Sequence, residues 1–247
     1  MGNSVTRHYA FALRNMLDTG HDGSVNRTAE KYKCESKVLG TSSCELPRLD
    51  GISPPITFWW KNYLGSAHEI AADDAARDVC HQMQTGSCLR SLFSGYNASD
   101  VLVVGSLPIN ITHFNAIGGS SFSSLEKAGP AFAAANAAAD LPMLEQMLVH
   151  GFPGAILWHS YAYVDMARHT GDRSFDFNHC FDRISNATAC ALSRGRAGAG
   201  PSRMHFVDLR ALERSRLSEY ADAIHHPGKL SEAIVKELVR VASDMPS

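Results

Sequence analysis

Residues 100–106, with the sequence DVLVVGS, form a short apolar run between an aspartate and a glycine. A run of branched apolar residues that ends at turn-forming residues is typical of a buried β-strand. Similar runs occur at residues 56–60, 155–158 and 205–209. We therefore expect strands at these three places and at residues 101–105.

Amphipathic or alanine-rich stretches separate these runs and predict helices at residues 7–17, 67–83, 125–149, 177–194 and 230–242. Strands that alternate with helices pair in parallel, because each crossover covers one face of the sheet. We predict a single α/β domain over residues 1–247. Residues 31–55 are expected to form a surface loop. The glycine-rich residues 195–201 are expected to form another, since they precede a strand and lack the G-K-[ST] ending of a phosphate-binding loop.

The composition is that of a globular protein: 247 residues, 45% hydrophobic and 19% charged. The 23 basic and 25 acidic residues give a net charge of -2, so there is no electrostatic reason to expect nucleic acid as a partner. No apolar stretch approaches the ~18 residues that a spanning helix requires, so we expect no membrane span. Arg7, His8 and Arg14 interrupt the beginning of the chain, where the apolar segment of a secretory signal would lie.

The cysteines and glycosylation sequons nevertheless favour a luminal or secreted location. The cysteines form three near-neighbour pairs, Cys34 and Cys44, Cys80 and Cys88, and Cys180 and Cys190. Local disulfides are one interpretation of these pairs, and buried free thiols are the other. No C-x-x-C pair occurs, so we expect no zinc site. N-x-[ST] sequons occur at Asn26, Asn97, Asn110 and Asn186.

The beginning of the chain, MGNSVT, has two interpretations. It fits the M-G-x-x-x-[ST] pattern of N-myristoylation, with Gly2 as the attachment point. Alternatively, Gly2, Asn3 and Ser4 form a tight turn that presents a serine nucleophile. A single lipid chain gives only marginal membrane binding, and the sequence offers no polybasic patch as a second signal. We therefore favour the nucleophile turn.

Near the other end of the chain, Asp222 and His225 stand three residues apart, ahead of the last predicted helix. This spacing can place a carboxylate against one imidazole nitrogen, which fixes the tautomer and raises the basicity of the other nitrogen. A serine near that second nitrogen becomes a usable nucleophile. Loops converge at the carboxyl edge of a parallel sheet, so we expect Ser4 to meet the pair there. The alternative is that His225 is a surface residue at a helix start, with His226 as its exposed neighbour.

With GNSVTR at the start, DVLVVGS in the middle and DAIHHPG near the end, the sequence resembles the SGNH hydrolase superfamily. The closest resemblance is to its PC-esterase branch. This branch includes plant trichome birefringence-like polysaccharide O-acetyltransferases and the catalytic domains of sialic acid O-acetyltransferases. The resemblance covers nearly the whole chain in order, since PPITFWWKNYL and GAILWHS are similar to further blocks of the family. It implies a three-layer α/β/α fold around a mainly parallel, flavodoxin-like sheet.

The resemblance also implies roles for individual residues. Ser4 would attack the acyl carbonyl, with Asp222 and His225 supplying the acid and base. The Ser4 amide would bind the oxyanion together with Arg7, Gly105 or Asn110. Of these we place Gly105 above Asn110, because an asparagine that carries a glycan cannot also donate to a buried oxyanion.

The sequence departs from the family in two ways. Asn3 stands where the family has an aspartate, which removes a charge beside the serine and leaves the nucleophile in place. Only Met1 precedes Gly2, where the family has a buried strand, so we expect a truncated chain that lacks its first strand.

We therefore expect a carbohydrate O-acyl esterase or O-acetyltransferase that needs no metal or organic cofactor. Its partner would be a glycan that bears O-acyl groups, in the Golgi lumen or outside the cell. One alternative is a non-catalytic, disulfide-bonded glycan-binding or scaffold domain of the same fold. Another is a myristoylated cytosolic adaptor. His159, His169 and His179 are expected to be structural residues.

Overall fold

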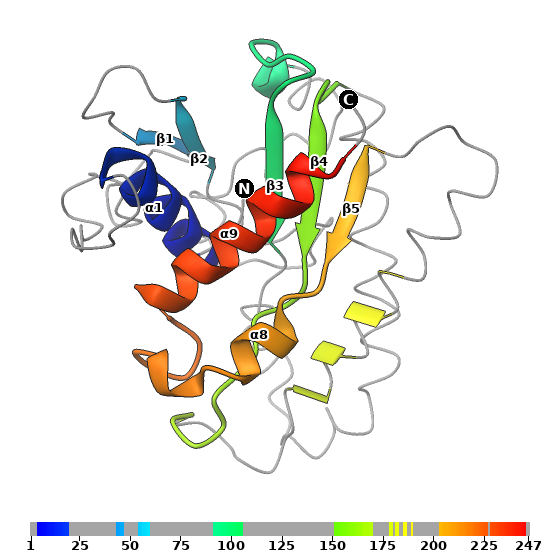
Figure 1. The fold of residues 1–247 in the computed structure, drawn as a ribbon. Helices are drawn as coiled ribbons and strands as arrows, with labels where there is room; N and C mark the ends of the chain where they lie inside the picture. Colours follow the sequence, from blue (N-terminus) through cyan, green and yellow to red (C-terminus); the bar gives the residue numbers. More distant parts are fainter. Residues whose placement is uncertain are drawn as a thin grey trace, which may run out of the picture.

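The computed structural model describes residues 4–19, 43–46, 54–59, 91–105, 151–169, 203–226 and 228–245, together with residues 178, 179, 181, 182, 185, 186 and 189. Within these ranges the element order is α1-β1-β2-β3-β4-β5-α8-η1-α9, and Figure 1 shows their arrangement. The main elements, described in turn below, are two long helices and two small sheets.

The larger sheet is parallel and has the strand order β3-β4-β5. Its strands are β3 (Val101–Gly105), β4 (Ala155–His159) and β5 (Met204–Val207). Gly105 pairs with His159, and His159 pairs with Val207, so the three carboxyl ends lie level with one another. The strand predictions at 101–105, 155–158 and 205–209 are confirmed to within two residues, and so is the α/β class.

The second sheet corrects two predictions. Strand β2 (Ile56–Trp59) pairs antiparallel with β1 (Ser43–Leu46), so neither belongs to the parallel sheet. Residues 43–46 lie inside the stretch that the sequence predicts to be a loop. The connection between the two strands, residues 47–55, is too short for the crossover that parallel strands require. The two strands therefore form a hairpin beside helix α1 (Figure 1).

Helix α1 (Ser4–Thr19) carries its apolar residues at helical spacing. Val5, Tyr9, Ala12 and Met16 are all buried, and their spacings of four, three and four place them on one face. A different face of the helix holds Phe11, which packs with Leu46 of β1. The helix begins three residues before the predicted start at residue 7, so Ser4 lies in its first turn instead of in a preceding turn.

Helix α9 (Lys229–Ser243) follows Gly228, whose φ of 90° is a conformation that favours glycine. Its buried residues Leu230, Ile234 and Leu238 form one stripe, which packs beside α1 (Figure 1). Leu157 of β4 belongs to the same apolar cluster. The two helices therefore cover one face of the parallel sheet, and the prediction of a helix at 230–242 is confirmed.

The other face of the parallel sheet is buried as well. Because side chains alternate along a strand, the residues that face away from α1 and α9 are the neighbours of those in the helix-facing cluster. They include Leu102, Val104, Ile156 and Trp158, none of which is more than 3% exposed. Burial of both faces explains why these strands read as continuous apolar runs in the sequence.

Two short elements follow β5 that the sequence analysis does not predict, α8 (Arg210–Arg214) and the 3-10 helix η1 (Leu217–Glu219). The helices predicted at residues 67–83 and 125–149 lie outside the described residues. The helix predicted at 177–194 is described only in part, and all seven described positions there are helical. The predicted loop at 195–201 and all six cysteine side chains also lie outside the described part of the chain.

Candidate active site

Asp222 and His225 form a direct polar contact at the carboxyl side of the sheet. Asp222 Oδ2 lies 2.6 Å from Nδ1 of His225, and the two side chains are 56% and 28% exposed, respectively. An ionised carboxylate only accepts hydrogen bonds, so Nδ1 carries the ring proton and donates it to Asp222. Nε2 is then the nitrogen that can accept a proton from a nearby hydroxyl.

The local sequence folds so that this contact is built into a turn. The second carboxylate oxygen of Asp222 accepts hydrogen bonds from the backbone N–H groups of Ile224 and His225, both at 2.8 Å. The backbone N–H of Ala221 donates to the carbonyl of His225 at 2.7 Å. A short side chain that bonds to backbone two and three residues ahead is a common turn-forming arrangement of aspartate. The turn therefore holds the Asp222 carboxylate beside the His225 imidazole.

These hydrogen bonds also determine the charge of Asp222. Partial burial by itself would raise the pKa of the Asp222 carboxyl. The hydrogen bonds from the Ile224 amide, the His225 side chain and the His225 amide outweigh burial, and the net shift of the Asp222 pKa is downward. The carboxylate is thus ionised at neutral pH and able to orient the histidine.

The first turns of α1 lie against this pair. The ring centroid of His8 is 5.5 Å from that of His225. Ser4 is the first residue of α1 and precedes His8 by four residues, so the two positions share one face of the helix. The Ser4 side chain lies outside what the structure describes. Its backbone position nevertheless falls one helical turn from the histidine that contacts His225.

His8 stays uncharged at neutral pH. Burial lowers the pKa of its imidazole to about 4, and the neighbouring charges of His225 and Arg7 act in the same direction. A neutral His8 can pack beside His225 without repelling it when His225 gains a proton. It is a residue of the site that the sequence analysis did not identify, although its position four residues after Ser4 offered a signal.

Gly105 brings α1 close to the strand ends. A Cβ atom at this position would lie 2.0 Å from Thr6 Oγ1 and 2.5 Å from His159 Nε2, so a side chain has no room. Thr6 Oγ1 in turn lies 3.3 Å from His159 Nε2. Thr6, the third residue of α1, therefore rests on the carboxyl ends of β3 and β4. This is the edge of the sheet where the sequence predicts that Ser4 meets Asp222 and His225.

The remaining predicted oxyanion residues are placed only in part. Arg7 is half-buried, and its guanidinium carbon lies 5.8 Å from the centroid of the Phe11 ring. Asn110 lies outside the described residues. The structure thus brings together Asp222, His225 and the start of α1, while the contribution of Gly105, Arg7 and Asn110 to an oxyanion site stays a prediction.

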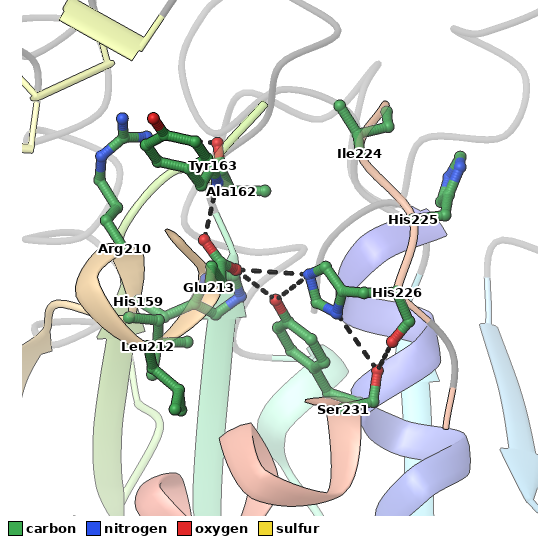
Figure 2. Close-up of polar contacts among 12 residues, drawn as sticks. His159, Ala162, Tyr163, Arg210, Leu212, Glu213, Ile224, His225, His226 and Ser231 are labelled. Atoms are coloured by element: carbon green, nitrogen blue, oxygen red, sulfur yellow. Dashed lines mark hydrogen bonds and ion pairs between the residues drawn. The ribbon is translucent and has the colours of Figure 1, made fainter. Parts of the chain in front are cut away.

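Behind the pair lies a buried polar cluster that sequence reasoning missed. Figure 2 shows His226 pointing toward Glu213, while the neighbouring His225 points in a different direction. His226 is only 1% exposed, so the description of it as an exposed neighbour is wrong. Its partners are Glu213 of α8 and Tyr9 of α1. No sequence signal points to this cluster, because Tyr9 lies 204 residues before Glu213 and 217 residues before His226.

Comparison of the chain with protein-family models, with curated proteins and with solved structures gave no match. Among the described residues, no group of three or more His, Cys, Asp or Glu side chains is placed to hold a metal ion. The helices in the described part of the chain include none with the length and apolar character needed to cross a membrane.

Proposed function

We propose that this chain is a serine-dependent O-acyl esterase or O-acetyltransferase that forms an acyl-enzyme on Ser4. The observation that carries the proposal is the 2.6 Å contact of Asp222 with Nδ1 of His225, beside the helix that begins at Ser4. Carboxylate, imidazole and hydroxyl in this order are the parts that acyl transfer requires.

The acylation step uses all three groups. Ser4 Oγ attacks the carbonyl carbon of the ester while His225 Nε2 takes the hydroxyl proton, and Asp222 stabilises the imidazolium that results. Collapse of the tetrahedral intermediate breaks the ester C–O bond, and His225 returns the proton to the departing alcohol. The products of this step are the free alcohol and an acyl ester on Ser4.

The start of α1 supplies a place for the oxyanion of this intermediate. The first N–H groups of a helix have no acceptor within the helix and carry its partial positive charge. Ser4 occupies this first turn, so its own amide can donate to the alkoxide that develops. Gly105 and Arg7, which lie near the same turn, remain the proposed further contributors.

The second step decides between hydrolysis and transfer. A water molecule or a sugar hydroxyl gives its proton to His225 and attacks the acyl carbon. The bond from that carbon to Ser4 Oγ then breaks, and His225 returns the proton to Ser4, which yields a carboxylic acid or a new ester and the free serine. The choice depends on which acceptor reaches the acyl-enzyme. The proposal of a carbohydrate acceptor, and of the three-layer SGNH fold, rests on the sequence resemblance.

We also propose a location in the lumen of the secretory pathway or outside the cell. Four sequons support this proposal, and two of them can be placed in the structure. Asn97 and Asn186 are both exposed, as an asparagine must be to carry a glycan.

Labelling with a fluorophosphonate probe tests the proposed function. The chain is expected to label at Ser4, and Ser4→Ala is expected to abolish labelling. His225→Ala and Asp222→Asn are expected to slow it by about two to four orders of magnitude, because the base is lost or misoriented. Ser243→Ala, a change at an exposed serine of α9, is the matched control and leaves labelling unchanged. A folded chain that does not label, or that labels equally in Ser4→Ala, contradicts the proposal.

A further inference from the structure

The buried polar cluster consists of Tyr9, Glu213, His226 and Ser231. Each side chain belongs to a residue that is at most 3% exposed. They come from α1, from α8, from the loop that carries His225 and from α9, so the cluster joins four segments (Figure 2). Burying this many polar groups is costly unless each has partners, and here each has at least one.

Glu213 is the centre of the cluster. Its Oε1 accepts a hydrogen bond from the Tyr9 hydroxyl at 3.1 Å and lies 3.4 Å from His226 Nε2. Its Oε2 accepts the backbone N–H of Tyr163 at 2.7 Å, in the segment that follows β4. One carboxylate therefore ties α1, the His225 loop and the end of the sheet to α8.

The imidazole ring of His226 is held by a stacking contact on its face and by polar contacts at both ring nitrogens. The ring stacks on Tyr9 with a centroid separation of 5.6 Å and an interplanar angle of 22°. Nδ1 lies 3.5 Å from Ser231 Oγ. The Ser231 hydroxyl donates its proton to the backbone carbonyl of His226 at 2.6 Å, so its oxygen is left to accept from Nδ1. The imidazole is thus restrained on every side that the structure describes.

Ser231, His226 and Glu213 are the residue types of a catalytic triad, yet they do not form a second active site. All three are 1% exposed, so a substrate has no access to them. The Ser231 proton already bonds to a carbonyl oxygen, which leaves the histidine no proton to remove. We therefore consider a structural role for the cluster.

We infer that Glu213 is a positioning residue for His225, acting through His226 and Tyr9. His226 is bonded to His225 through a single peptide link, so restraining its ring fixes the backbone that carries the His225 imidazole. Tyr9 lies five residues after Ser4 on α1, so the same carboxylate also holds the helix that presents the serine. The inference rests on the proposed function, because it concerns the distance between the proposed base and nucleophile.

The expected effect of losing this restraint is large because acyl transfer is sensitive to small displacements. A shift of about 1 Å between reacting groups can reduce a rate about hundredfold. Glu213→Ala is expected to lower the plateau of the labelling rate by about this factor while leaving the pH midpoint of labelling unchanged, since Asp222 still orients His225. Glu213→Gln keeps an acceptor for the Tyr163 amide and places a side-chain N–H where it can donate to His226 Nε2, so it is expected to restore most of the rate.

A second readout does not depend on activity. Hydrogen exchange of the 221–226 loop directly reports two amide hydrogen bonds, from the Ala221 N–H to the His225 carbonyl and from the His225 N–H to the Asp222 carboxylate. In Glu213→Ala these amides are expected to exchange about tenfold faster, because a buried carboxylate that joins three segments is gone. Glu237→Ala is the matched control, since Glu237 is a partly exposed carboxylate of α9 whose ion pair with Arg240 lies at the surface.

The two readouts separate the inference from the proposed function. Loss of both labelling and loop protection in Glu213→Ala, with recovery in Glu213→Gln, supports the inference. Wild-type labelling and exchange in Glu213→Ala overturns it, and so does a Glu213→Gln variant that is as slow as the alanine variant. If the unaltered chain does not label, the proposed function fails and the exchange result alone decides whether Glu213 holds the loop. If Glu213→Ala does not fold, Tyr9→Phe provides the test, because it removes a single hydroxyl from the cluster. This variant is expected to show a smaller decrease in labelling rate and a smaller increase in amide exchange. A Tyr9→Phe variant that shows neither change overturns the inference.

Discussion

His159 at the end of β4 makes the stability of this fold dependent on pH. The side chain belongs to a residue that is 1% exposed, and its Nδ1 donates to the carbonyl of Ser160 at 2.9 Å. Nε2 therefore accepts, and its partner is the Thr6 hydroxyl. Burial lowers the pKa of His159 to about 4, even though the Ser160 hydrogen bond acts in the opposite direction.

The sign of the effect follows from comparing the two states. In the unfolded chain His159 takes up a proton as the pH falls below about 6.5, whereas in the folded chain it stays neutral down to about pH 4. Between these values the unfolded state binds more protons, so the free energy of unfolding decreases as the pH falls. For this one residue the decrease is about 2 kcal/mol between pH 7 and pH 5 and about 3 kcal/mol by pH 4.

The test replaces His159 with glutamine, which can accept from Thr6 and does not titrate. Urea unfolding of the chain and of His159→Gln at pH 7 and pH 5 gives the free energy of unfolding in each case. We expect the variant to be less stable at pH 7 and to lose about 2 kcal/mol less than the unaltered chain when the pH is lowered to 5. His179→Gln, the same change at an exposed position, is the control. An unchanged pH dependence in His159→Gln would refute the reasoning.

Three further outcomes follow from the structure. Gly105→Ala is expected to destabilise the fold by about 1–3 kcal/mol in urea unfolding, because the new Cβ would meet Thr6 and His159; a neutral result would show that α1 does not rest on β3 as described. Ile234→Ala removes a fully buried side chain between α1 and α9 and is expected to cost about 2–5 kcal/mol, with a loss below about 1 kcal/mol arguing against that packing. In secretory-pathway expression the chain is expected to carry a glycan at Asn97, seen as a mobility shift that peptide N-glycosidase removes and that is reduced in Asn97→Gln; an identical pattern in the variant would exclude glycosylation at this position.

The parallel strands were predictable because each carries a strong local signal. Residues 101–105 and 155–158 are apolar runs that end at turn-forming or polar residues, and burial on both faces keeps the run continuous. The hairpin partner at residues 43–46 was not predictable in the same way. Its sequence, SCEL, has neither a sustained apolar run nor a regular alternation, and it becomes a strand by pairing with β2.

In the candidate site, too, the local interactions were predictable from the sequence and the long-range interactions were not. Asp222 and His225 were identified together because their interaction is local and a spacing of three residues is visible in the sequence. Glu213 was missed because its contacts with Tyr9, Tyr163 and His226 depend on where α1, β4 and α8 come together. No pattern along the chain records such an arrangement. His8 lies between these cases, since its helical face was predictable and its contact with His225 was not.

The packing of α1 against α9 has a consequence for the order in which the molecule is assembled. The Tyr9 hydroxyl and the His226 ring come within 3.4 Å although 217 residues separate them along the chain. During synthesis α1 leaves the ribosome before α9, and the apolar face of α1 has no native partner from α9 until that helix has also emerged. Closing so long a loop is a late and slow event. The proposed nucleophile and base would therefore meet only after the segment that carries His225 has emerged, so that a nascent chain can carry Ser4 without carrying the activity.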